Sequence, residues 1–191
     1  MTTVSIFGAG NMGPAIAGIV EKGGNTAEVL ERDDTNKPIT GEVVILAVPY
    51  AAVSEVLAER TEQLAGKVVV DITNPVDFET FDSLTVPADA SAAAEIAAAL
   101  PQSKVLKAFN TNFAATLSSG TTGEKATTVL IAGDDADAKA QLAQIVTDGG
   151  LHAIDAGTLR RARELEALGF LQMTLAAGEK FTWTGGFAVQ N

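Results

Sequence analysis

Short runs of apolar, largely β-branched residues alternate along the chain with stretches whose apolar positions recur every three or four residues. The short runs predict buried strands, and the longer periodic stretches predict helices. The predicted strands are Val4–Phe7, Ala27–Leu30, Val43–Val48, Lys67–Ile72, Lys104–Phe109, Thr128–Ala132 and His152–Asp155. The predicted helices are Ala15–Lys22, Ala52–Leu64, Ser91–Leu100, Asp137–Thr147 and Thr158–Phe181. Strands and helices in alternation predict an α/β fold with a mostly parallel sheet.

The starts of two predicted helices carry polar residues of the kind that cap a helix. Asp89 or Ser91 can cap the alanine-rich helix, and Pro101 ends it. The acidic segment Asp134–Asp137 lies at the start of the next helix, where negative charge complements the helix dipole. We therefore interpret this segment as a cap and not as a metal site.

The last predicted helix changes character along its length. It begins with the arginine-rich segment Arg160–Arg163, and from Leu165 to Ala177 it is apolar almost all round. Such a helix must be buried on several sides, which predicts packing within the domain or a homodimer contact. We interpret the arginines as a surface face paired with Glu164 and Glu166; the alternative is a cationic wall over a binding cleft.

Charge and composition narrow the choice of function. The chain has 191 residues, 13 basic and 24 acidic side chains, and a net charge of −11, which argues against nucleic-acid and anionic-membrane partners. It has no cysteine, which excludes disulfides, thiolate metal sites and a cysteine nucleophile. The apolar N-terminus lacks a cationic region, and the longest apolar run, Val43–Val53, is too short to span a bilayer. We expect a cytoplasmic protein.

A glycine-rich turn follows the first predicted strand directly. Its residues are Gly8, Ala9, Gly10, Asn11, Met12 and Gly13, and a helix follows. A G-x-G-x-x-G sequence between a strand and a helix is the fingerprint of a dinucleotide-binding turn. Gly8 would make the tight turn, Gly10 would let the backbone approach a pyrophosphate, and Gly13 would allow the helix to pack close to the strand. Free N–H groups at the helix start then hold the phosphates.

The two residues that would contact the adenosine ribose favour different coenzymes. Glu31 ends the second predicted strand, where an acidic side chain accepts from ribose hydroxyls and favours NAD. The next residue, Arg32, can pair with a 2′-phosphate and favours NADP. The choice between the two coenzymes stays open at this point.

Several motifs spread over nearly the whole chain carry a family resemblance. They are Ile6–Gly13, Ile45–Tyr50, Val70–Pro75, Val105–Thr111, Asp155–Leu159 and Leu168–Gly169. With them the chain resembles the small NADP-dependent oxidoreductases typified by the NADPH-dependent reductases of coenzyme F420, and also the oxidoreductase domain of the six-transmembrane ferric reductases. The resemblance implies a Rossmann domain with helices on both faces of its sheet, residues 1–156. It also implies a small C-terminal helical segment, residues 157–191, that closes the cleft or forms a dimer contact.

The same resemblance implies an activity and a set of cofactor-binding residues. The activity is hydride exchange between NADP(H) and a flavin- or deazaflavin-like acceptor. Gly10, Asn11 and Met12 would contact the pyrophosphate, and Arg32 would hold the 2′-phosphate. Residues that follow the later strands would line the cofactor, and the matching motifs include Val48, Pro49, Tyr50, Thr73, Asn74, Pro75, Asn110 and Thr111.

The chain departs from the family pattern in two places. Only ten residues separate Arg32 from Val43, too few for the helix and strand of a complete mononucleotide-binding half. We therefore expect a sheet shortened after its second strand, with a more open adenosine side. In addition, Glu31 replaces the small or polar residue that the family usually has before the arginine.

No acid–base or metal-binding arrangement is recognisable, so the catalytic residues are unknown. The single histidine, His152, precedes a late strand and is interpreted as structural, and Tyr50 is not followed by the lysine of a Tyr-x-x-x-Lys pair. Hydride transfer to a flavin-like ring requires positioning more than a protein base. The alternatives are a non-catalytic dinucleotide-sensing protein and reduction of an imine or keto acid, which usually requires a larger helical domain.

Overall fold

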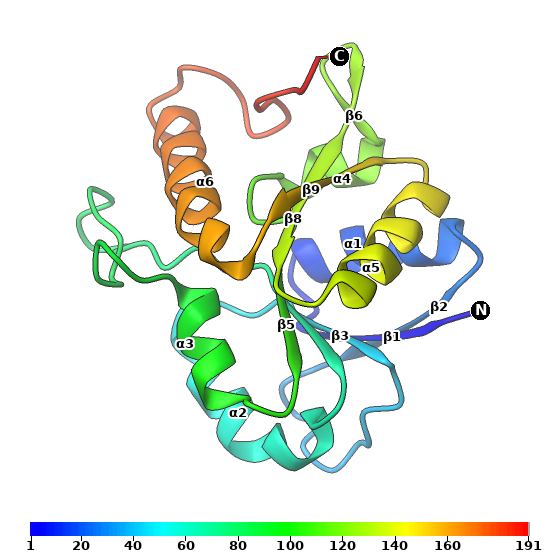
Figure 1. The fold of residues 1–191 in the computed structure, drawn as a ribbon. Helices are drawn as coiled ribbons and strands as arrows, with labels where there is room; N and C mark the ends of the chain where they lie inside the picture. The colour runs from blue at the N-terminus through cyan, green and yellow to red at the C-terminus, as the bar shows by residue number, and fades with distance from the viewer. Residues whose placement is uncertain (191) are drawn as a thin grey trace.

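The computed structural model describes residues 1–190, and its central feature is a seven-stranded sheet (Figure 1). The strand order is β2-β1-β3-β4-β5-β8-β9. The strands are β1 (Thr3–Phe7), β2 (Thr26–Leu30), β3 (Val43–Leu46), β4 (Val68–Asp71), β5 (Lys104–Lys107), β8 (Thr128–Gly133) and β9 (His152–Gly157). Strands β1 to β5 are parallel, β8 pairs antiparallel with β5, and β9 is parallel to β8. The predicted mostly parallel α/β fold is confirmed.

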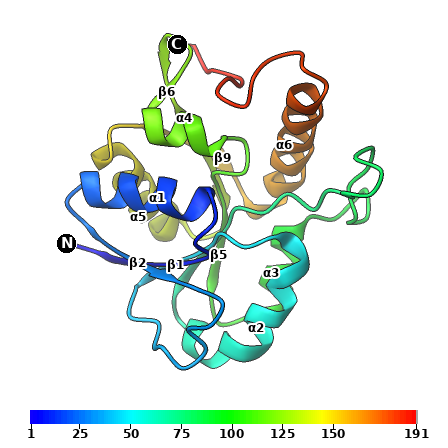
Figure 2. The ribbon, with the colours of Figure 1, turned by 180° about the vertical axis from the view of Figure 1, so that it is seen from behind.

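Helices cover both faces of the sheet, because the side chains of the central strands β3, β4 and β5 are buried almost throughout. The helices are α1 (Met12–Lys22), α2 (Tyr50–Leu64), α3 (Ala92–Ala99), α4 (Ala114–Ser119), α5 (Ala136–Asp148) and α6 (Ala162–Ala177). In β3, Val43 and Ile45 pack with α1, α4 and α5, whereas Val44 and Leu46 pack with α2 and α3. Figure 2 shows the two groups of helices on opposite sides of the sheet. The predicted caps are confirmed for Ser91 and Asp135, whose side chains accept from the backbone N–H groups of Ala94 and Ala138.

The expected shortening after the second strand is present. Residues 31–42 form neither helix nor strand, and β2 is an edge strand paired only with β1. The connection is held by Arg60 of α2, which is 4% exposed. Its guanidinium donates to the carbonyl oxygens of Lys37, at 3.0 Å, and Asp34. A buried arginine therefore takes the place of the missing crossover as the support of this loop.

The C-terminal helix is joined to the sheet by buried charges. Lys107 of β5 is fully buried, and its Nζ lies 2.7 Å from Asp71 Oδ2 and 2.8 Å from Glu166 Oε1. The other oxygen of Glu166 accepts from the backbone N–H of Ala92, at 2.9 Å. The prediction that Glu166 pairs with surface arginines is wrong, because burial beside Lys107 gives it a stronger partner. Of the two glutamates, only Glu164 pairs with arginine side chains.

Three short elements were not predicted, and one long helix was overextended. The unpredicted elements are α4 and the hairpin of β6 (Thr121–Thr122) and β7 (Lys125–Ala126). The predicted helix Thr158–Phe181 divides into a 3-10 turn, η1 (Leu159–Arg161), and α6, which ends at Ala177. Its apolar face is only partly covered, since Leu171 is 49% exposed.

Candidate functional site

The turn between β1 and α1 is built on two glycines that no other residue can replace without displacing the backbone. Gly8 has φ = +114°, and a Cβ added there would lie 2.3 Å from the carbonyl oxygen of Ala47. A Cβ added at Gly13 would lie 1.9 Å from the carbonyl oxygen of Gly8. Both distances are far below van der Waals contact, so these two glycines serve the packing of α1 on β1 and β3.

Gly10 has a different role, because a Cβ there would meet no protein atom within 4 Å. It lies at the open edge of the turn, next to the start of α1, where Asn11 provides no side-chain cap. The first N–H groups of α1 therefore have no side-chain partner from the helix cap and can donate hydrogen bonds to an anion. Free space above a glycine and uncapped N–H groups together fit a pyrophosphate.

An outer cavity of about 780 Å³ opens on the β2 side of this turn. Its lining includes Gly8, Gly10, Glu31, Arg32, Val48, Pro49, Glu55 and Glu59. The Arg32 side chain is 87% exposed, and its guanidinium lies 3.6 Å from the Glu55 carboxylate. Arg32 is thus the exposed cation in a mostly acidic rim, placed to meet a phosphate from solvent.

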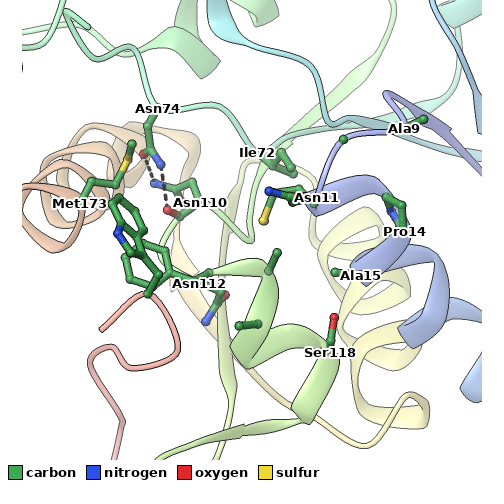
Figure 3. Close-up of a pocket in the computed structure, with 16 residues that line it drawn as sticks. Ala9, Asn11, Pro14, Ala15, Ile72, Asn74, Asn110, Asn112, Ser118 and Met173 are labelled. Carbon is green, nitrogen blue, oxygen red and sulfur yellow. Dashed lines mark hydrogen bonds between the residues drawn. The ribbon is translucent and has the colours of Figure 1, made fainter. Parts of the chain in front are cut away.

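An inner cavity of about 860 Å³ opens on the other side of the turn (Figure 3). It is lined by Ala9, Gly10, Asn11, Met12, Pro14, Ala15, Ile72, Asn74, Asn110, Asn112, Phe113, Ala114, Ala115, Ser118, Met173 and Trp183. None of these side chains is charged, although the chain as a whole carries −11. Ala9 and Gly10 line both cavities, so the inner and outer cavities meet at the glycine-rich turn.

Asparagine amides form one wall of the inner cavity. Asn110 Nδ2 donates to Asn74 Oδ1 at 3.0 Å, and Asn74 Nδ2 donates to the Asn110 carbonyl oxygen at 3.0 Å (Figure 3). The side-chain oxygens of Asn110 and Asn112 are buried without a hydrogen-bond partner among the described residues. Each such oxygen costs roughly 1–3 kcal/mol of folding free energy.

The segment that carries these asparagines is strained as well. Phe109 is buried and has φ = +61°, a conformation that costs an aromatic residue about 1–3 kcal/mol. It turns the chain sharply after β5, directly before Asn110. Backbone strain and unpaired buried polar atoms beside a cavity are typical of a functional site.

Helix α6 closes this wall from outside. The carbonyl oxygen of Leu165 accepts from Asn110 Nδ2 at 2.8 Å, and Gln172 Nε2 donates to the carbonyl oxygen of Thr111 at 3.1 Å. A Cβ at Gly169 would lie 2.5 Å from Asn74 Oδ1, so only glycine allows this approach. The C-terminal helix therefore fixes the asparagine wall directly.

The structure brings most of the predicted site residues to the two cavities. Gly8, Gly10, Glu31, Arg32, Val48 and Pro49 line the outer cavity, and Gly10, Asn11, Met12, Asn74 and Asn110 line the inner one. Gly13, Thr73, Pro75 and Thr111 line neither cavity, although Thr73 and Thr111 are buried beside the inner one.

Tyr50 is not brought to either cavity. It lines a separate groove between α2 and α3, where its hydroxyl donates to the Glu95 carboxylate. Partial burial, together with that hydrogen bond and the glutamate's charge, raises the pKa of the Tyr50 hydroxyl above its ordinary value. Tyr50 therefore stays protonated and fixes the start of α2.

Sequence reasoning missed several residues of the inner cavity, among them Asn112, Phe113, Met173 and Trp183. Asn112 and Phe113 follow the predicted asparagine motif closely, so a wider window would have included them. Met173 and Trp183 come from α6 and the segment after it, and no local pattern marks them. The segment Arg160–Arg163 lines neither cavity, so the alternative of a cationic wall finds no support.

Within residues 1–190, no three His, Cys, Asp or Glu side chains come together as a metal site. No helix of that same range is long and apolar enough to cross a bilayer.

Comparisons with known proteins agree with this geometry. The profile of the family described as NADP oxidoreductase, coenzyme F420-dependent, matches residues 32–75. The F420-dependent NADP reductase of Methanocaldococcus jannaschii is 30% identical over 171 residues, which are 87% of this chain and 76% of that protein. The crystal structure of a candidate F420-dependent NADP-reductase from Arthrobacter sp. FB24 has a TM-score of 0.87 and 25% identity, with both chains covered completely.

A likeness to a metalloreductase is also present, over a shorter region. Rat metalloreductase STEAP3 is 35% identical over 127 residues, which are 66% of this chain and only 25% of that protein. The fold, the glycine-rich turn and these relatives agree: the chain belongs to the family of F420-dependent NADP oxidoreductases, and it is an NADP-dependent oxidoreductase.

Proposed function

We propose that the protein transfers a hydride between NADP(H) and a flavin- or deazaflavin-like acceptor, coenzyme F420 being the acceptor that the family name suggests. The observation that carries the proposal is the meeting of two cavities at Ala9 and Gly10. A dinucleotide lying across the turn would extend its adenosine into the outer cavity and its nicotinamide into the inner one. The remaining space of the inner cavity would hold the acceptor.

The residues of the inner cavity support positioning chemistry. When bound, NADPH supplies the hydride and the acceptor ring takes it up. The N–H groups at the start of α1 would hold the pyrophosphate, and the amides of Asn74 and Asn110 would orient the nicotinamide carboxamide. Met12 and Ile72 provide apolar surface that excludes water from the reacting rings. No titratable side chain lines this cavity, so the role of the protein is orientation.

A turnover assay tests this proposal. The protein and NADPH are mixed with one acceptor at a time, which is coenzyme F420, FMN or riboflavin. The absorbance of the reduced nicotinamide is followed in each mixture. We expect saturable loss of that absorbance with at least one acceptor. Tight binding of NADPH without turnover of any acceptor would instead favour the non-catalytic, dinucleotide-sensing alternative.

Arg32 is proposed to select the coenzyme by contacting the 2′-phosphate. Its exposure and its single weak partner, Glu55, leave the guanidinium available. Replacing Arg32 with Ser should raise the Kd of NADPH about tenfold or more and leave the Kd of NADH nearly unchanged. Glu55→Gln is the matched control, and it should strengthen NADPH binding by less than about fivefold, since exposed ion pairs are weak. Equal loss of both coenzymes in Arg32→Ser would contradict this role.

We further propose a homodimer formed through α6. Leu171 is 49% exposed, and Leu168, Phe170 and Leu175 of the same helix are only half-buried. A second copy would cover this apolar face. Light scattering at micromolar concentration tests the proposal, and a monomer at that concentration would refute it.

The division of the chain at residue 156 and the cytoplasmic location stay predictions.

A further inference from the structure

The segment that follows α6 folds back over the inner cavity and is fixed at two points. At its start, Lys180 N donates to the carbonyl oxygen of Leu175 at 2.9 Å, and Glu179 adopts φ = +56°. Further along, Phe187 N donates to Gln172 Oε1 at 3.2 Å. Between these two points lies Trp183, which lines the inner cavity. The segment is therefore a tethered strap that presents one large aromatic ring to the cavity.

Trp183 belongs to a small aromatic cluster but is not buried by it. Its ring centroid lies 4.9 Å from that of Phe113, with 51° between the ring planes. Phe113 also contacts Phe181, at 6.4 Å between centroids. Even so, Trp183 is 48% exposed, so a large part of the indole surface has no protein partner. An indole held in place by a tethered strap and left half uncovered is suited to stack on a ligand.

The rest of the inner cavity indicates what kind of ligand this is. Met173 of α6 and Trp183 both line the cavity. In Figure 3, Met173 lies across the cavity from Pro14 and Ala15, on the opposite side from the glycine-rich turn. No charged side chain lines the cavity, and the asparagines supply hydrogen-bonding groups. Such a site favours a flat ring system with apolar faces and polar edges.

We propose that Trp183 is the outer wall of the acceptor subsite and stacks on a fused tricyclic ring of the isoalloxazine or 5-deazaisoalloxazine type. The proposal rests on the proposed function, because it assumes that the nicotinamide occupies the end of the inner cavity nearest Gly10 and Met12. It assigns the opposite end, at Met173 and Trp183, to the acceptor ring. Trp183 is then a specificity-determining residue for the acceptor and contributes nothing to NADPH binding.

The test compares binding of the two partners in matched variants. Trp183→Leu removes the aromatic ring, Trp183→Phe keeps a smaller one, and Phe78→Leu removes an aromatic residue that is 66% exposed and lines neither cavity. The Kd values of riboflavin and 5-deazariboflavin are measured from the fluorescence of those ligands, and the Kd of NADPH from its own fluorescence.

We expect Trp183→Leu to raise the Kd and the KM of the acceptor about tenfold, with kcat and the Kd of NADPH changed less than twofold. Trp183→Phe should lie between Trp183→Leu and the wild type, and Phe78→Leu should match the wild type. Unchanged acceptor binding in Trp183→Leu, or no binding of either ring by the wild type, would overturn the proposal. So would an equal loss of NADPH and acceptor binding with a lowered Tm, which indicates a structural role.

The wild-type protein supplies an independent signal, because Trp183 is the only tryptophan of the chain. The emission of Trp183 in the wild type should fall when riboflavin or 5-deazariboflavin binds. This measurement does not depend on whether Trp183→Leu folds. Unchanged emission at a saturating concentration of either ligand would refute stacking. The outcomes also separate the two proposals. Trp183-dependent binding without turnover refutes the hydride-transfer function but keeps the subsite. Turnover with an unchanged acceptor KM in Trp183→Leu refutes the subsite alone.

Discussion

Replacing Gly10 with Ala should separate cofactor binding from folding, because Gly10 is the one glycine of the turn that the cofactor-free fold does not require. Its φ lies outside the left-handed range, and an added Cβ meets nothing within 4 Å. Alanine at such a position changes the free energy of unfolding by less than about 1 kcal/mol, and it can stabilise by restricting the unfolded chain. The same Cβ would occupy the space over which the pyrophosphate has to pass.

The matched control is Gly13→Ala in the same turn. Its Cβ would lie 1.9 Å from the Gly8 carbonyl oxygen, so either α1 or β1 must shift. We expect Gly13→Ala to lower the free energy of unfolding by about 3 kcal/mol or more. For Gly10→Ala we expect wild-type stability with the Kd of NADPH raised at least tenfold, which corresponds to about 1.4 kcal/mol.

Two measurements test these expected changes in stability and NADPH affinity. They are urea denaturation of each protein without cofactor, and titration with NADPH followed by its fluorescence. NADPH binding to Gly10→Ala at wild-type affinity would refute the assignment of the pyrophosphate to this turn. If the cofactor-free Gly10→Ala protein were destabilised as much as Gly13→Ala, this would refute the inference that a Cβ at position 10 fits into free space without disturbing the fold.

Three further variants test the contacts of α6. Lys107→Met should lower the free energy of unfolding by about 3–5 kcal/mol, because Asp71 and Glu166 lose their buried partner. The loss should be smaller at pH 5 than at pH 7.5, since Glu166, whose pKa burial raises, can then take up a proton. Burial raises the pKa of Glu166, although the charge of Lys107 opposes the shift. The contribution of Glu166 to the free energy of unfolding is therefore complete below the ordinary glutamate pKa and is lost as the pH rises through the raised pKa. The stability of the wild type relative to Glu166→Gln should therefore fall from pH 4 to pH 7.5 in urea denaturation, and a relative stability that rises with pH would contradict this sign. Gly169→Ala should lower the free energy of unfolding by about 1–3 kcal/mol in the same assay, despite the higher helix propensity of alanine. The reason is that the new Cβ would lie 2.5 Å from Asn74 Oδ1. A gain in stability would show that α6 does not pack tightly against Asn74.

The elements that the sequence predicts well are those whose signal is local. The strand β3 is apolar at every position and β4 at three of its four, and the glycine-rich turn places three glycines at a fixed spacing, so these elements are recognisable from a few neighbouring residues. The caps Ser91 and Asp135 lie next to the helices they start. The hairpin and α4 were missed because two-residue strands and a six-residue helix are too short to show a period.

Contacts between residues far apart in the chain could not be predicted. Lys107 and Glu166 are separated by 59 positions, and the periodicity of α6 gives no reason to place a glutamate among buried residues. Trp183 is equally remote from the motifs that line the inner cavity. The strained backbone of Phe109 also has no sequence signal, because it is imposed by the packing around it. The glycine-rich turn and the two asparagines of the inner cavity could thus be named in advance, and the residues contributed by α6 and the segment after it could not.

The contact between Glu166 and the start of α3 bears on how the protein folds. The backbone N–H groups of Ala92 and Ala93 point to a carboxylate that lies 74 and 73 positions further along the chain. A helix of eight residues, mostly alanine, is marginal by itself, so we expect the start of α3 to be completed when α6 docks. The pairing of α3 with α6 has a high sequence separation, so we expect these two helices to fold more slowly than the β1–α1–β2 unit. In amide hydrogen exchange, Ala92 and Ala93 should open together with α6 and not with the rest of their own helix.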